Sequence, residues 1–231
     1  MRQVHPQLEQ LRKIPRHKHH PLQHHIHKKH HISKRTLFYI KEYGPKSNVS
    51  GTIIKESIKI LLLASIISSF GGFALEEVKA VFITLTPLVI LLPTLNGMVG
   101  GYGTIISSKF STMLHEGKLQ KEWWIDTNLK KLFFQLLLIS CLTTVISTTL
   151  ALVISRAMGS GFGGTLLLKI FLIALFDVVM LVSLLFMISI IVGRHIYDKG
   201  EDPNNFLIPI TTAIADFGNM VILSFLILIF F

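Results

Sequence analysis

Five long apolar stretches constrain this chain more than any other feature of its sequence. Each is close to or above the roughly 20 residues that an α-helix needs to cross a bilayer. Only helices and closed barrels span lipid, and barrel strands alternate between apolar and polar residues, which these stretches do not. We therefore predict an all-α integral membrane protein with five transmembrane helices. The stretches cover residues 58–75, 80–108, 132–154, 166–192 and 206–231.

Composition agrees with a membrane protein and argues against several functions. Of the 231 residues, 50% are hydrophobic and only 16% are charged, whereas a soluble domain carries about 25% charged residues. The net charge of +10 comes mostly from residues 1–35, where nine Lys or Arg minus one Glu leave +8. A basic tail alone does not indicate nucleic-acid binding, so we expect no nucleic-acid partner. No phosphate-binding loop or nucleophile–base pair stands out, so we expect no enzyme, no cofactor and no ATP-driven pump.

The distribution of Lys and Arg predicts how the chain is oriented, because cytoplasmic loops are enriched in both. The tail before the first apolar stretch is basic, and the 109–131 connection carries five lysines. The 76–79 turn is acidic, and the 156–164 connection has a single Arg. This alternation predicts a cytoplasmic N-terminus and an external C-terminus in the cell membrane. Four or six helices would break the alternation.

We expect a basic cytoplasmic tail at residues 1–50, partly disordered, and a transmembrane domain at residues 51–231. Histidine binds transition metals, so the tail could gather zinc, cobalt or nickel, whereas a polybasic arm binds anionic lipid. The cationic neighbours and the lack of a fixed ligand spacing favour the lipid-bound arm. The candidate metal ligands in the tail are His19, His20, His24, His25, His27, His30 and His31.

Asp216 is the one charged residue in the 206–231 stretch. A charge at the bilayer centre costs at least about 2.5 kcal/mol, and such residues usually face a pore, a partner or a proton path. Asp216 lies about ten residues into its helix, roughly 15 Å deep. Thr212 and Asn219 are four and three residues away, so we expect them on the same face. Alternatively, Asp216 caps a helix break or pairs with a basic group, for which Lys169 is the candidate.

The second stretch combines two prolines with four glycines, which break or kink a helix. Irregular backbone at membrane depth is tolerated where protein buries it or where it lines a water-filled cavity, and broken helices offer carbonyls to cations. We therefore predict a broken helix that lines the same path as Asp216, through Asn96, Gly97 and Gly100. Close helix packing through Gly97 and Gly101, four residues apart, is an alternative that is compatible with this prediction.

Asp177 is a second intramembrane acid, near the middle of the 166–192 stretch. It could line the path or serve as a structural partner. Carboxylates, amide oxygens, hydroxyls and free carbonyls are hard ligands that suit Mg²⁺ or Ca²⁺ better than soft metals. Because Mg²⁺ loses water reluctantly, one or two carboxylates facing a partly hydrated ion would suffice.

Two motifs resemble the MgtE-type magnesium and divalent cation transporter family, which is related to magnesium solute carriers of animals. The first covers residues 93–103 and 107–117 and is similar to the family's proline, glycine-rich break and Ser-Arg-x-Ser-Thr segment. The second runs from Asp202-Pro203-Asn204-Asn205 through Pro209 and Thr212 to Asp216 and is similar to the signature that enters helix 5. The resemblance extends over about residues 52–231.

The resemblance implies five helices with the N-terminus inside, in a homodimer or tandem repeat with a central ion path. It implies that Asp216 binds the hydrated ion, that residues 96–101 form the adjacent wall, and that Glu76 and Glu77 match an outer acidic position. Gly101 replaces an Asn that many members have, and Ile105 replaces a bacterial Gln, which weakens any inference about selectivity. Only about fifty residues precede helix 1, so we expect this half-size form to lack the cytosolic sensor of bacterial members.

We therefore expect a dimeric Mg²⁺ transporter or channel with Asp216 at its centre. A transition-metal carrier fed by the tail, or a non-transporting subunit that pairs with a paralogous chain, are the alternatives. Membrane lipid and divalent cations are the other expected partners.

Overall fold

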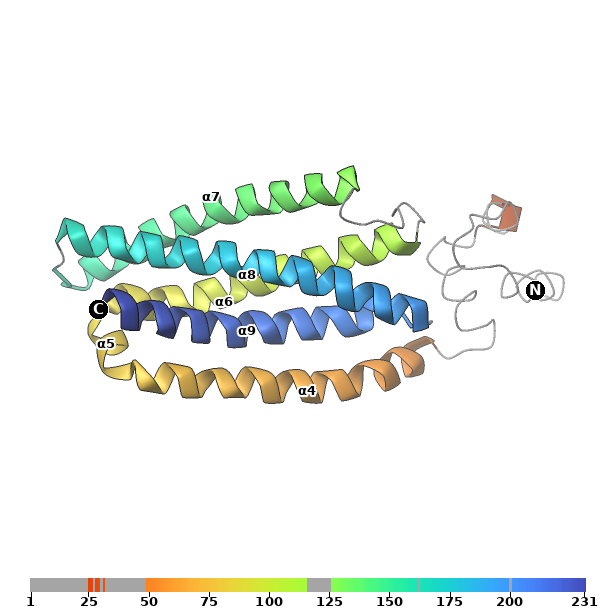
Figure 1. Ribbon diagram of the computed structural model, residues 1–231, viewed down its shortest axis with the longest axis horizontal. Coiled ribbons are helices and arrows are strands. Elements are labelled where there is room, and N and C mark those ends of the chain that lie inside the picture. Colours follow the sequence, from red (N-terminus) through yellow and green to blue (C-terminus); the bar gives the residue numbers. More distant parts are fainter. Residues whose placement is uncertain are drawn as a thin grey trace.

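The computed structural model describes residues 25–26, 28–29, 31, 49–115, 126–161, 163–199 and 201–231. Within these residues the chain is helical, without any strand. Figure 1 labels the main helices, which follow one another in an elongated bundle. Their bounds are α4 Val49–Glu77, α5 Lys79–Thr84, α6 Thr86–His115, α7 Thr127–Ala157, α8 Gly164–Lys199 and α9 Pro203–Phe230.

Five of these helices, α4, α6, α7, α8 and α9, are long and apolar enough to cross a membrane. Each contains most or all of one of the apolar stretches, so the prediction of an all-α chain with five spans is confirmed by length and composition. The helices also extend beyond the apolar cores. α4 begins at Val49, before the first apolar stretch, and α8 continues to Lys199, nearly two turns beyond the fourth stretch.

The last helix occupies the centre of the bundle. α9 packs against α4, α6 and α8, while α7 packs against α6 and α8 on the far side from α4. In Figure 1 the five long helices alternate in direction, and the C-terminus lies at the same end as α5. Hydrogen bonds join elements at that end: Ser160 donates to Thr86 (3.1 Å), and Lys169 Nζ donates to the carbonyl of Phe230 (2.7 Å).

The second apolar stretch is interrupted at Leu85 and not at the prolines or glycines. Leu85 has φ −99° and ψ 75°, between α5 and α6. Pro87 lies in the first turn of α6, where its missing N–H removes no helical hydrogen bond. From Thr86 to His115 the helix is continuous, with Pro93 inside it. The predicted break between Pro93 and Gly103 is therefore not confirmed.

The α6 glycines that pack against α9 are not the expected pair. A Cβ on Gly103 would lie 3.0 Å from Thr211 Cβ, and a Cβ on Gly100 would lie 3.8 Å from Thr212 Cγ2. Gly97 and Gly101 have nothing within 4 Å of such a Cβ. The packing hypothesis for Gly97 and Gly101 is therefore wrong within this chain, and their side of α6 is open.

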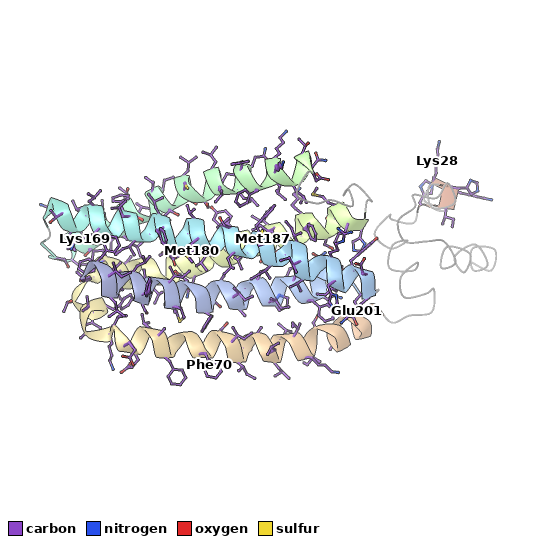
Figure 2. All side chains as sticks on the ribbon, viewed as in Figure 1. Lys28, Phe70, Lys169, Met180, Met187 and Glu201 are labelled. Carbon is purple, nitrogen blue, oxygen red and sulfur yellow. The ribbon has the colours of Figure 1, made fainter. Side chains whose placement is uncertain are left out.

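α4 is the outermost helix of the bundle. Its contacts are concentrated on α9, and only 11% of the apolar window in its span is buried. Most of its large apolar side chains are exposed, as expected of a helix that faces lipid. Figure 2 shows one of them, Phe70, pointing away from the bundle. α4 therefore forms one lateral wall of the bundle, and α9 separates it from α6 and α8.

Candidate functional site

Three polar side chains from α6, α8 and α9 meet inside the bundle. Asn219 on α9 and Asp177 on α8 are both 0% exposed, and Asn96 on α6 is partly buried. The amide of Asn219 contacts the amide of Asn96. With its nitrogen turned toward α8, Asn219 donates to Asp177 Oδ2 at 2.6 Å, and its carbonyl accepts from the backbone N–H of Asn96 at 3.0 Å. We call Asp177, Asn219 and Asn96 the three-helix cluster.

The second carboxylate oxygen of Asp177 is unusual for a buried polar atom. Asp177 Oδ1 has no hydrogen-bond partner among the described residues, although the side chain is fully buried. Most buried polar atoms in proteins are hydrogen-bonded, and an exception calls for an explanation. The sequence analysis identified Asp177 as an intramembrane acid, but it did not predict that Asn219 and Asn96 would be its neighbours.

Asp216 lies on a different side of α9. Among the described residues it contacts Ser68 on α4, whose hydroxyl donates to Asp216 Oδ2 at 3.5 Å, the limit of a hydrogen bond. Asp216 is half-buried, whereas Asn219 is fully buried. The polar stripe of α9 therefore faces two different neighbours, because Asp216 meets α4 and Asn219 meets α6 and α8. We call the contact between Asp216 and Ser68 the α4–α9 seam.

The alternative roles for Asp216 do not fit this geometry. α9 is a continuous helix from Pro203 to Phe230, so Asp216 does not cap a break. Lys169 is not its partner, because Lys169 Nζ bonds the carbonyl of Phe230 and lies 4.9 Å from the centre of the Phe231 ring. Figure 2 places Lys169 near one end of the bundle. No ion pair with Asp216 occurs in the part of the chain that the structure describes.

Other predicted residues are placed as follows. Thr212 faces α6 next to Gly100, and its hydroxyl donates to the carbonyl of Ile208 (2.9 Å). Glu76 pairs with Lys79 (2.9 Å) at the end of α4, and both side chains are exposed; Glu77 is also exposed. These acids therefore lie at the end of the bundle that carries the C-terminus and away from the three-helix cluster.

Only two of the predicted tail ligands can be located. His25 and His31 are exposed. His19, His20, His24, His27 and His30 lie outside the described residues. Among the described residues, no group of three or more His, Cys, Asp or Glu is arranged to hold a metal ion.

A polar cluster at the other end of α9 was missed by the sequence analysis. Asp202 Oδ1 caps α9 by accepting from the backbone N–H of Asn204 (3.0 Å), and the Ser111 hydroxyl donates to the same oxygen (3.5 Å). His115 Nε2 lies 3.7 Å away, and its ring packs edge-on against Tyr197. We call Ser111, His115 and Asp202 the end cluster. The Asp202-Pro203 start of α9 could be seen in the sequence, but the contacts of Asp202 with Ser111 and His115 on α6 could not.

The surroundings of Asp202 act on its pKa in opposite directions. Burial by itself raises the pKa of this carboxyl. The neighbouring His115 imidazole, the N–H of Asn204 and the Ser111 hydroxyl favour the ionised form and together outweigh burial, so the pKa lies below its ordinary value. The end cluster therefore joins α6 to the start of α9 through an ionised carboxylate.

The comparison with known protein families settles the class of protein. The family model described as MgtE, a divalent cation transporter, matches residues 92–226, more than half of the chain. The chain belongs to the MgtE divalent cation transporter family. The family resemblance predicted from the two motifs is confirmed, and this MgtE-family chain is a multi-pass membrane protein. The matched region contains the three-helix cluster, Asp216 and the end cluster, whereas all of α4 precedes it.

Curated relatives support the same family. The chain is 28% identical over 193 residues to solute carrier family 41 member 2 of Gallus gallus, which covers 78% of this chain and 33% of the relative. The Homo sapiens protein of the same name is 28% identical over 195 residues, with the same coverage. The MgtE-family chain thus aligns with about a third of the length of these relatives. No solved structure matches it.

Proposed function

We propose that this chain carries Mg²⁺ across the cell membrane along a path beside Asp216, Thr212 and α6. Its membership of a divalent cation transporter family supports the class of substrate. The single observation that carries the proposal is the half-buried Asp216, because it is an intramembrane acid without a cationic partner among the described residues. Mg²⁺ keeps most of its water, so a partly accessible carboxylate suits it better than a sealed one.

We also propose that a second copy, or a paralogous subunit, completes the path. The face of α6 that α9 leaves open is unusual for a lipid-facing surface, because it is lined by small and polar residues. Its exposed small or polar members are Pro93, Thr94, Gly97, Gly101, Ser108 and Thr112, and the large apolar Ile105 is exposed among them. Small residues let helices approach closely in membranes, and hydroxyls on this face gain more from a partner or an aqueous path than from lipid.

The proposed orientation has the N-terminus inside and the C-terminus outside. In Figure 1, α6 ends and α7 begins at the same end of the molecule as the start of α4, and the sequence that joins α6 to α7 is lysine-rich. α8 ends at that end too, and its last turns contain Arg194 and Lys199. Positive loops remain cytoplasmic. In this orientation Glu76 and Glu77 lie outside, and residues 1–50 form a basic cytoplasmic tail against anionic lipid.

Mg²⁺ uptake into proteoliposomes tests the proposal, with Asp216→Asn and Asp216→Glu beside the wild type. A lost charge about 4 Å from the ion, at an effective dielectric constant of 20, corresponds to about 4 kcal/mol. We therefore expect Asp216→Asn to lower flux by at least about 100-fold, while Asp216→Glu keeps part of it. Asp198→Asn removes an exposed acid at the end of α8 and is the matched control.

The outcomes separate the alternatives. If Asp216→Asn transports Mg²⁺ at the wild-type rate, this carboxylate is excluded from the path. No flux in the wild type, with intact protein, would favour a non-transporting subunit. Loss of transport of Zn²⁺, Co²⁺ or Ni²⁺ on deletion of residues 1–35, with Mg²⁺ transport absent throughout, would favour the transition-metal carrier.

A further inference from the structure

The three-helix cluster has a direction that follows from the chemistry of its members. A carboxylate oxygen only accepts hydrogen bonds, whereas an amide side chain both donates and accepts. Asn219 must therefore turn its nitrogen toward Asp177 Oδ2, 2.6 Å away. Its carbonyl then faces α6, where it accepts from the backbone N–H of Asn96 at 3.0 Å. The orientation of an amide is assigned from such a network, and here the Asp177 carboxylate and the backbone N–H of Asn96 decide it together.

The same logic extends to the next side chain. The side-chain amides of Asn219 and Asn96 are in contact. Because the Asn219 carbonyl faces Asn96, the Asn96 amide must present its nitrogen to that carbonyl. The Asn96 carbonyl oxygen is then the free end of the chain of amides. Asn96 is partly exposed, and its neighbour Gly97 borders open space, whereas Asp177 and Asn219 are sealed.

We propose that Asp177 is a positioning residue that sets the direction of this amide relay and so presents the carbonyl oxygen of Asn96 to the transported cation. The proposal rests on the function proposed above and adds to the path an oxygen ligand on α6 that is separate from Asp216, which meets α4. An amide carbonyl is a hard ligand for Mg²⁺ or for its bound water. Asp177 itself does not contact the ion, because it lies behind Asn219.

Burial explains why a carboxylate occupies this position. An asparagine at 177 can either accept or donate, so only the backbone N–H of Asn96 would then hold Asn219 in this orientation, and the direction of the amides would be less firmly fixed. The carboxylate removes this choice, at the cost of a buried Oδ1 that has no hydrogen-bond partner among the described residues. A cost of this kind at a sealed position is expected where a side chain serves function more than stability.

The test compares Asp177→Asn with the double variant Asp177→Asn/Asn96→Asp, in the full chain. In Asp177→Asn we expect the half-saturating Mg²⁺ concentration for uptake to rise about tenfold, with the maximal rate within about threefold of wild type. In the double variant, residue 96 presents a carboxylate oxygen whichever way Asn219 turns. We therefore expect the half-saturating concentration to return to within about threefold of wild type.

Ser189→Ala is the matched control, since it removes another fully buried polar atom without a described partner from the same helix. It should leave both kinetic parameters unchanged. Isothermal titration of the purified protein with MgCl₂ gives a readout that does not require flux, and affinity should follow the same order. A merely structural role for Asp177 predicts lower thermal stability, unchanged Mg²⁺ affinity and no rescue by Asn96→Asp, and that result would overturn the proposal.

The two proposals fail in different ways. In one outcome the wild type shows no flux, but MgCl₂ binding weakens in Asp177→Asn and recovers in the double variant. That outcome would remove the transport function and keep the positioning role. In another outcome the wild type transports Mg²⁺, and both Asp177 variants bind Mg²⁺ with the wild-type affinity. That outcome would remove the positioning role and keep the transport function. Absence of both binding and flux in the wild type would overturn both.

Discussion

The three-helix cluster and the α4–α9 seam hold the two intramembrane acids of this chain in opposite ways. Asp177 is sealed between α8 and α9 and bonded by Asn219 at 2.6 Å. Asp216 is half-buried, and the hydrogen bond that it accepts within the described part of the chain is weak, at 3.5 Å from Ser68 on a peripheral helix. We propose that an ion with its water approaches the more loosely held acid. The tightly held acid is suited to orienting its neighbours.

Replacing one glycine on each side of α9 by alanine should show the difference between the two regions most strongly, as a difference in the free energy of unfolding. Gly103→Ala puts a Cβ 3.0 Å from Thr211 Cβ and 3.3 Å from Leu185. Thr211 is fixed by bonds to the Leu207 carbonyl (2.8 Å) and to Ser107 (3.3 Å). We expect a loss of about 1–3 kcal/mol in the free energy of unfolding, as is typical of overpacking, measured by reversible denaturation in detergent.

The matching change in the seam is Gly71→Ala. Its Cβ would lie 2.8 Å from Met220 Sδ, the flexible part of a methionine, and 3.3 Å from the Phe217 backbone. Because α4 packs mainly on α9, it can shift, and we expect a smaller loss than for Gly103→Ala. Gly72→Ala is the control, since nothing lies within 4 Å of its Cβ. An equal or larger loss in Gly71→Ala would contradict the idea that the seam is the more adaptable side.

Acid should weaken the anchoring of α6 to α9 at the end cluster. The folded-state pKa of Asp202 lies below its ordinary value, so the stability from its ionised form is present above the unfolded pKa and lost as pH falls through the folded pKa. We expect thermal stability to fall below about pH 4. Asp202→Asn should lower stability near neutral pH and flatten this acid dependence. A similar acid dependence in wild type and variant would assign it to other groups.

The smallest effect should come from Ser68→Ala. A partly buried hydroxyl that donates at 3.5 Å contributes little, so we expect less than about 0.5 kcal/mol in stability and flux within about threefold of wild type. Mg²⁺ uptake by the same proteoliposomes measures the latter. A loss of flux comparable to that of Asp216→Asn would show that Asp216 and Ser68 act as a fixed pair. The contrast between the α4–α9 seam and the three-helix cluster would then no longer hold.

Much of the architecture could be predicted from local patterns. Each apolar stretch was long enough to specify a span, whereas the start of α9 at Pro203 lies before the predicted stretch, which began at residue 206. The break predicted within the second helix was not confirmed, because Pro87 lies in a first turn, where proline is tolerated, and Pro93 is accommodated inside α6. Packing through Gly97 and Gly101 was an alternative in the sequence analysis, and within this chain Gly100 and Gly103 pack against α9 instead.

The sequence by itself determined the class of this protein: the number of spans, the acids at membrane depth and the two motifs of the MgtE family. These depend on lengths and spacings along one chain. Only the tertiary structure decided which polar residues meet. Asn96, Asp177 and Asn219 come from three helices, and residues of one stripe on α9 face different neighbours. Helix periodicity sets which side chains share a face, whereas packing between helices sets what that face contacts.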